Sequence, residues 1–274
     1  MSTEETKLMD PSLAGLPQHL IDAAQVGGET GMESMSEYLT PPRVKIMQPS
    51  RKEPFKSEFE EGVVISTPSN TVLCGVDGHF AYTVIYTYDQ FCVHNPWERP
   101  DDMPYIREST LDKRSVIAQK CRNYVSEPCP EVAGEEIKYM THINALIMVH
   151  GMKDTSIQGV PLMLSQYSGE AKSGRQMLDL LHTRCQNGTP IYAHRLMAHQ
   201  VPRKKGRNEW QGLDHSNPGP DVPFGPFIED AVEFAHYKEL YLKAKELVES
   251  GKIVVDYEDE TTPEEGAEVT SDTL

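Results

Sequence analysis

The stretch that decides the fold is residues 79–93, HFAYTVIYTYDQFCV, a long run that is rich in β-branched and aromatic residues. Large side chains occupy alternate positions along it, at Phe80, Tyr82, Val84, Tyr86 and Tyr88. A period of two is typical of a strand that turns one face toward a core. We therefore predict a long strand here, with these side chains on one of its two faces.

Shorter strands are predicted on both sides of this run. Val44 and Ile46 alternate with Arg43 and Lys45 directly after a Pro-Pro pair, which is the pattern of a half-buried strand. Similar stretches occur at residues 62–67, 71–75, 137–150, 159–167 and 191–201. The third and fourth of these are expected to form a hairpin around Gly151.

Two longer helices are predicted from apolar positions three and four residues apart. Residues 169–185 follow Ser168, which is suited to cap a helix. Their apolar stripe consists of Ala171, Gly174, Leu178, Leu181 and Cys185. Residues 229–249 place on one side Tyr237, Leu240, Tyr241, Ala244, Leu247 and Val248. A shorter helix is expected near residues 111–121, within the otherwise irregular segment 94–136.

This order of elements indicates an α+β, mainly β fold. An OB-like Greek-key barrel also places its helix between its third and fourth strands, so we expect that architecture with an inserted loop region. The predicted parts are a flexible acidic N-terminal arm (1–40), the OB-like core (41–215), a linker with the C-terminal helix (216–250) and an acidic disordered tail (251–274).

Charge is distributed unevenly along a chain whose net charge is −16. Residues 171–210 contain eight Lys and Arg against two acids, a net charge of +6. Residues 221–274 contain 15 acids against four bases, and residues 1–40 contain seven against one. A basic segment between acidic ends is typical of a protein that binds a polyanion and carries a tail that competes for the same surface.

The cysteines and the N-terminal residues indicate a cellular compartment. The chain has 5 Cys, an odd number at irregular spacing, and residues 2–7, STEETK, lack the basic and apolar segments of a secretory signal. We therefore expect reduced thiols in a cytosolic protein. The longest apolar run, 143–149, is far shorter than the ~20 residues of a membrane span.

Single-stranded nucleic acid is bound by cations that follow the phosphates and by aromatic faces on which bases stack, each stack contributing ~1–3 kcal/mol. The candidate phosphate ligands are Arg43, Lys45, Lys172, Arg175, Arg195, Arg203, Lys204, Lys205 and Arg207. The candidate stacking residues are Tyr82, Tyr86, Tyr88, Trp97, Tyr192 and Trp210. For Tyr82, Tyr86 and Tyr88 the alternative is that all three rings face the core. For residues 204–207, KKGR, the alternative is a solvated hairpin tip.

Metal and enzyme motifs are weak. Cys92 and His94 form a Cys-x-His pair, and Cys121 and Cys129 lie in the same loop-rich region, but structural zinc sites usually contain closer pairs. Residues 169–176, GEAKSGRQ, resemble a phosphate-binding loop that lacks its lysine and hydroxyl residue. No G-x-S-x-G or H-E-x-x-H motif occurs. We therefore expect neither a cofactor nor enzymatic activity.

Several short stretches resemble a family of tailed-bacteriophage proteins, at residues 38–53, 59–65, 139–149, 165–175, 190–195 and 206–210. The layout also resembles phage single-stranded DNA-binding proteins, which pair an OB-fold with an acidic C-terminal tail. The resemblance implies single-stranded DNA protection during phage replication and recombination in the cytoplasm of an infected bacterium, with the tail contacting other replication or recombination proteins. Such tails often end in an aromatic residue, whereas this chain ends at Leu274.

Two other classes stay open at this point. With a net charge of −16, the chain could present carboxylates in place of phosphates, as a DNA mimic or an inhibitor of a host nuclease or polymerase. The third class is a virion assembly protein, which would not bind DNA. Deletion of residues 257–274 separates the first two, since it should tighten DNA binding in one case and weaken inhibition in the other.

Overall fold

The computed structural model describes residues 41–48, 59–67, 69–100, 102–151, 159–205, 208–219 and 225–253. The predicted N-terminal arm and nearly all of the predicted acidic tail lie outside these ranges. Within them, no helix is both long and apolar enough to cross a membrane.

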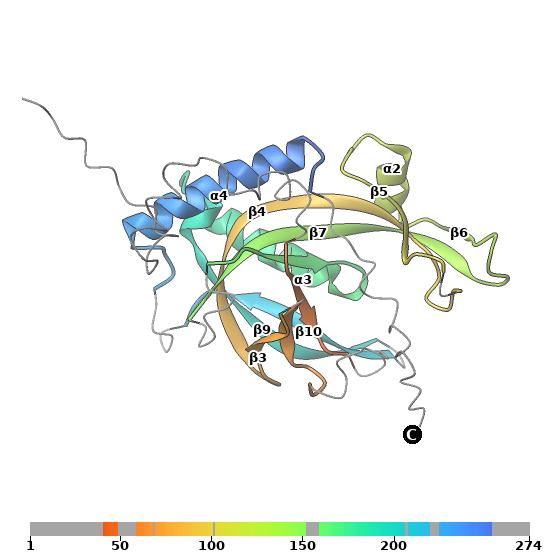
Figure 1. Ribbon diagram of the computed structural model, residues 1–274, viewed down its shortest axis with the longest axis horizontal. Coiled ribbons are helices and arrows are strands. Elements are labelled where there is room, and N and C mark those ends of the chain that lie inside the picture. The colour runs from red at the N-terminus through yellow and green to blue at the C-terminus, as the bar shows by residue number, and fades with distance from the viewer. Residues whose placement is uncertain are drawn as a thin grey trace, which may run out of the picture. The chain divides into compact units, whose positions relative to one another are not determined.

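The described chain is mainly β, with its strands in one continuous sheet that carries helices (Figure 1). The strands are β1 (Arg43–Ile46), β2 (Val64–Thr67), β3 (Thr71–Cys74), β4 (His79–His94), β5 (Ile106–Thr110), β6 (Ser126–Pro128), β7 (Glu136–His150), β8 (Leu162–Gln166), β9 (Arg195–Lys205) and β10 (Asn208–Ser216). The helices are α2 (Val116–Arg122), α3 (Ala171–Cys185) and α4 (Ala231–Glu249), with 3₁₀ turns at Ser168–Glu170 and Ile191–Ala193. These elements confirm the predicted α+β, mainly β class.

The sheet curls around its main core. Its order is β10-β9-β4-β7-β8-β1-β2-β3, with β5 added to β4 and β6 added to β7. The long strands β4 and β7 form an arch, with α4 along its outer side and α3, β9 and β10 beneath it (Figure 1). Met177 and Leu181 of α3 pack inside the curl against β-sheet residues such as Tyr82 and Leu196. The neighbours β7 and β8 are antiparallel, as the predicted hairpin requires, whereas β1 and β8 are parallel.

A β-bulge at Ile85 changes the face on which the tyrosines of β4 lie. The register with β7 shifts between Val84 and Tyr86, so one extra residue stands on β4. Tyr82 and Val84 face the main core, whereas Tyr86 and Tyr88 lie with Ile85 in a second cluster beneath α4. The predicted single face is therefore wrong beyond Val84, because an inserted residue shifts the alternation by one.

The helices largely follow the predicted periodicity. The six apolar residues that we predicted on one side of α4 all belong to the cluster beneath it. Asp230 caps this helix by accepting hydrogen bonds from the backbone N–H groups of Val232 and Glu233. The predicted Ser168 cap of α3 is wrong, because Ser168 adopts a φ of 52° in the preceding 3₁₀ turn. The buried face of α3 is formed by Ser173, Gly174, Met177 and Leu181, so only Gly174 and Leu181 of its predicted stripe are fully buried.

The segment between β4 and β7, which we call the insertion (residues 95–135), is more ordered than its sequence indicated. It contains β5, α2 and β6, and it shares a hydrophobic cluster with the ends of β4 and β7. The predicted helix lies at Val116–Arg122 because the hydroxyl of Ser115 accepts a hydrogen bond from the N–H of Ala118. The insertion therefore has its own small core and can present side chains in defined positions.

Candidate nucleic-acid interface

A cleft of ≈ 1160 Å³ lies between the sheet and the insertion. Its walls come from β1, β7, β8, β10, the start of α3 and the insertion, so they join residues as distant in sequence as Arg43 and Leu213. Pockets for small molecules typically measure ~300–1,000 Å³. The volume of this cleft is slightly above that range.

The lining of the cleft is basic although the chain is acidic. Five basic side chains line it: Arg43, Lys45, Arg122, Lys138 and Arg175. Among the described lining residues only Asp89 and Glu170 are acidic, which leaves a net charge of +3 against −16 for the whole chain. Because salt screens charges beyond ~8 Å at physiological ionic strength, a bound anion responds to this local charge more than to the distant acids.

Aromatic rings form the second component of the lining: Trp97, Tyr105, Tyr124, Tyr139, Tyr167 and Trp210. Trp97 is 57% exposed and Tyr124 is 81% exposed, so both present ring surface to solvent. Exposed aromatic rings beside cations are the combination that single-stranded nucleic acid requires.

Trp210 is held in place on the cleft wall. Its Nε1–H donates to Oε1 of Glu170 (2.9 Å), and Oε2 of Glu170 accepts from the backbone N–H of Leu213 (3.0 Å). A Cβ atom on Gly169 would lie 3.0 Å from the indole ring, so the ring packs directly on the backbone there. Both carboxylate oxygens of Glu170 therefore accept hydrogen bonds from other residues of the cleft wall. These contacts fix the orientation of the Trp210 indole before any ligand binds.

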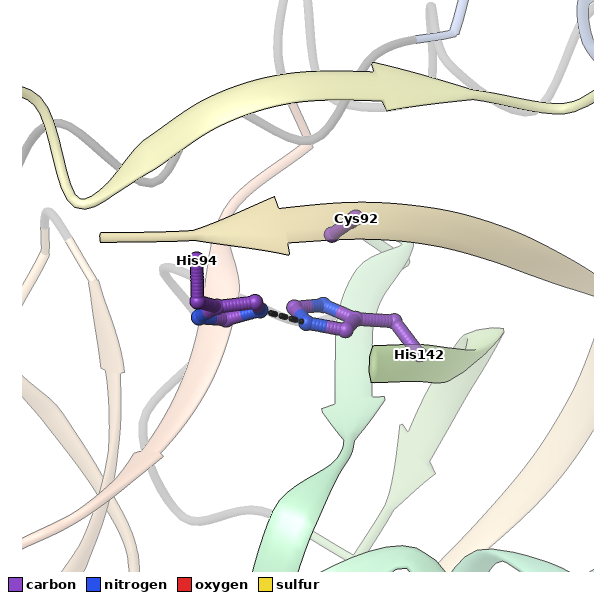
Figure 2. A group of neighbouring side chains, drawn as sticks. All are labelled: Cys92, His94 and His142. Atoms are coloured by element: carbon purple, nitrogen blue, oxygen red, sulfur yellow. Dashed lines mark hydrogen bonds between the residues drawn. The ribbon is translucent and has the colours of Figure 1, made fainter. Parts of the chain in front are cut away.

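Two rings of the lining rest on buried histidines. The ring of Tyr167 stacks on that of His142, with 4.0 Å between centroids and 4° between planes. The ring of Tyr105 meets that of His94 edge-on at 4.7 Å. The Nε2 atoms of the two histidines are 2.7 Å apart (Figure 2). Burial lowers the pKa of His142 well below its ordinary value, and the neighbouring His94 adds to this effect, so the His142 ring is neutral.

Five residues from the predicted DNA-binding set line the cleft: Arg43, Lys45, Trp97, Arg175 and Trp210. They belong to β1, the insertion, α3 and β10. The curl of the sheet brings these elements together, so a set chosen for residue type alone converges here in space.

Tyr86 and Tyr192 do not reach the cleft. Tyr192 is 8% exposed and packs against Phe234 and Tyr241, and Tyr86 packs against Tyr241 as well. Both rings belong to the cluster beneath α4. The structure therefore places both rings against α4 and outside the cleft lining, and the other two tyrosine candidates, Tyr82 and Tyr88, also do not line the cleft.

Arg195 and Arg203 are engaged within the fold. The guanidinium of Arg195 donates to the backbone carbonyl of Phe227 (2.7 Å) and lies 3.2 Å from Glu233. Arg203 donates to Asp214 (2.8 Å) and lies 3.7 Å from Glu170. Neither is among the residues that line the cleft, and both make tertiary contacts within the fold.

The remaining predicted cations lie elsewhere or outside the described part. Lys172 is exposed on α3, away from the cleft lining. Lys204 is exposed and paired with Glu209 across the β9–β10 hairpin. Arg207 and the side chain of Lys205 lie outside what the structure describes.

Sequence reasoning missed Arg122, Tyr124 and Lys138, which line the cleft. Arg122 ends α2, and Tyr124 follows it with a φ of 52°. Their position directly after the predicted helix 111–121, as a basic and an aromatic residue close together, could have identified Arg122 and Tyr124 as candidates. Lys138 is the exposed position between buried Ile137 and Tyr139, which strand alternation reveals.

The predicted set Cys92, His94, Cys121 and Cys129 does not converge. Cys121 donates its S–H to the backbone carbonyl of Met140 (3.3 Å), and Cys129 donates to Glu131 (3.4 Å). Both belong to the core of the insertion. Among the described residues, the ligand atoms that do converge belong to Cys92, His94 and His142.

Comparison with protein-family models, with curated proteins and with solved structures found no match to this chain.

Proposed function

We propose that this protein binds single-stranded DNA in the cleft without sequence specificity. The observation that carries the proposal is the lining of the cleft, which combines five cations and six aromatic rings in a chain with a net charge of −16. Phosphates would follow the cations, and bases would stack on exposed rings such as Trp97 and Tyr124. Cations and ring faces accept any base sequence, which is the reason for expecting little sequence preference.

The sheet order supports an OB-like reading of the core. If β4, β7, β8, β9 and β10 are numbered one to five, their order across the sheet is 5-4-1-2-3, and α3 joins the third to the fourth. OB-folds bind oligonucleotides on strands 2 and 3, between the 1–2 and 4–5 loops. In this numbering β7 and β8 are strands 2 and 3 and the insertion is the 1–2 loop, and residues of all three line the cleft. The difference is that β1, and not the fifth strand, pairs with β8.

The acidic tail is proposed to regulate this binding. Residues 256–268 contain seven acids and no Lys or Arg, so they could compete with DNA for the basic lining. When DNA displaces the tail, it would become free to contact replication or recombination proteins. The phage setting rests on the resemblance described above.

Fluorescence anisotropy with labelled oligo-dT tests the proposal, with a duplex of equal length and two salt concentrations. We expect tighter binding to the single strand, and weaker binding as salt rises, because phosphate contacts release counterions. The double variant Arg122→Ala/Lys138→Ala should lower the affinity and the salt dependence. Its matched control is Lys238→Ala/Lys243→Ala, two exposed lysines of α4 that do not line the cleft.

Two results would contradict the proposal. The first is salt-independent binding, because the phosphate contacts would then be wrong. The second is absence of binding even by a protein that lacks residues 257–274. That result would favour the DNA-mimic or inhibitor class.

A further inference from the structure

Three potential metal ligands meet beneath the cleft. Cys92 and His94 stand two residues apart on β4, so their side chains leave the same face of the strand. His142 comes from β7, where it pairs with Gln90. The ligand atoms of Cys92, His94 and His142 all lie within 4.8 Å of one another, and the three residues are at most 1% exposed. Figure 2 shows the two imidazoles meeting end to end between neighbouring strands.

We propose that Cys92, His94 and His142 bind a zinc ion. One thiolate and two imidazoles are ligands that zinc prefers, and they also exclude the hard cations magnesium and calcium. No fourth Cys, His or carboxylate belongs to this group among the described residues, so a water molecule would complete the tetrahedron. This site does not depend on the proposed DNA binding, since the three residues do not line the cleft.

Zinc would require the two imidazoles to move slightly apart. The two Nε2 atoms are 2.7 Å apart and share a proton in a hydrogen bond. Two imidazoles on a tetrahedral zinc ion, with Zn–N bonds of ~2.0–2.1 Å, place these atoms roughly 3.3 Å apart. The rings must therefore separate by about 0.6 Å, a movement that rotation of the side chains can supply.

Zinc binding requires both Nε2 atoms and the Cys92 sulfur to be free of protons. The Nε2 proton that lies between the rings moves to Nδ1 of the same imidazole, which leaves both Nε2 lone pairs for the metal. The thiol of Cys92 loses its proton to solvent as the Zn–S bond forms. Binding of each ion should thus release one proton from the protein, and the affinity should fall at low pH.

The position of the site suggests its role. Tyr167 stacks on His142 and Tyr105 contacts His94, and both tyrosines line the cleft. An ion here would join β4 to β7 and hold these rings from below. Since it binds the folded state, it would stabilise the region against unfolding by mass action.

The experiment is metal titration of the full-length protein after treatment with a chelator. Zinc should bind at about one ion per chain with release of about one proton, and should raise the midpoint of thermal unfolding. Cobalt, which replaces zinc and is coloured, should give the thiolate-to-cobalt absorption band. Cys92→Ser should abolish this band, while Cys185→Ser, at the more exposed end of α3, should retain it.

The His142→Asn variant covers the case in which Cys92→Ser fails to fold. It keeps the thiol but removes one proposed ligand. The loss of zinc affinity should be at least ~10-fold, the lower limit for mutating a residue that only hydrogen-bonds to a metal ligand. The proposal is overturned if the wild type binds neither metal at micromolar concentration. It is also overturned if the cobalt band persists in Cys92→Ser or disappears in Cys185→Ser. DNA binding is measured separately by anisotropy, so either proposal can fail without the other.

Discussion

The side chain of Gln48 pairs with the backbone of Gln211 as a neighbouring strand would. Its Nε2 donates to the carbonyl oxygen of Gln211 (2.7 Å), and its Oε1 accepts from the N–H of Gln211 (2.8 Å). The side chain of Gln211 in turn donates to Glu61 (2.8 Å). These bonds connect β10, at one end of the sheet, to residues around β1 and β2. The curl is therefore closed at this point by side chains and not by a strand ladder.

Replacement of Gln48 should weaken this closure. Gln48→Ala removes two hydrogen bonds, so we expect a loss of about 2 kcal/mol in the free energy of unfolding. Gln48→Glu keeps the acceptor but repels the Gln211 carbonyl, and it should also destabilise. Gln119→Ala, at an exposed position of α2, is the control and should change little. Urea denaturation measures these differences, and equal stability of Gln48→Ala and the control would contradict the role of this pair.

Intrinsic fluorescence should report on the cleft directly. The chain contains two tryptophans, Trp97 and Trp210, and both line the cleft. Oligo-dT should therefore change the emission, and a duplex should change it less. Trp97→Ala should weaken binding by about 1–3 kcal/mol through the loss of stacking. Phe227→Ala, an aromatic residue 49% exposed outside the cleft lining, serves as the control. An equal loss of affinity in both variants would argue against stacking on Trp97.

Gly212→Ala should release Trp210. A Cβ atom on Gly212 would lie 2.7 Å from Cδ of Glu170, so the carboxylate must move away. It would then lose its bonds to Trp210 and Leu213, at a cost of about 1–3 kcal/mol. In a Trp97→Phe background, the emission of Trp210 should shift to longer wavelength as the indole gains solvent. Gly219→Ala is the control, because its Cβ would meet nothing within 4 Å. Unchanged emission in Gly212→Ala would refute the contact.

Acid should destabilise the fold through His215. This ring is 2% exposed, its Nε2 accepts from Gln166 (2.9 Å), and its Nδ1 is 2.7 Å from the hydroxyl of Tyr82. Burial lowers the pKa of His215 to about 3. The unfolded chain binds a proton near pH 6.5, whereas the folded chain does so only near pH 3, so the unfolded state holds more protons in between.

The free energy of unfolding should therefore fall as pH decreases from about 6.5 to about 3, by up to about 1.4 kcal/mol per pH unit from this residue. Burial also lowers the pKa of His150, to about 4, which adds to the slope. Chemical denaturation at several pH values in this window measures the effect. His215→Gln should reduce the slope, and an unchanged slope would show that other groups control the acid sensitivity.

Removal of residues 257–274 should tighten binding of oligo-dT. The deleted segment contains seven acids and no Lys or Arg, and its loss removes a competitor for the basic lining. The gain should be several-fold at low salt and should shrink as salt screens the tail. Replacement by an equal length of Gly and Ser controls for chain length. Weaker DNA binding after deletion would contradict competition by the tail.

The local pattern of the chain was sufficient for most elements. Alternation predicted β4 and the β7–β8 hairpin, and the spacing of Tyr237, Leu240 and Ala244 predicted the buried side of α4. These features depend on neighbours in sequence, since each strand or helix must bury its own apolar side. Residue type alone also identified Trp97 and Trp210 as surface aromatic candidates, although nothing local indicated that they share a cleft.

Only the tertiary structure determined which residues from distant parts of the sequence contact one another. The bulge at Ile85 turned Tyr86 toward α4, and α4 also covered Tyr192. The guanidinium of Arg195 bonds to the carbonyl of Phe227 and pairs with the carboxylate of Glu233. From charge alone, Arg195 had been predicted to bind phosphate. The pairing of β1 with β8 and of β4 with β7 placed the cleft residues together and brought His142 beside His94. These residues become neighbours through contacts between segments that are far apart in sequence. The periodicity of one segment shows which of its sides is buried, but it does not show which other segment packs there.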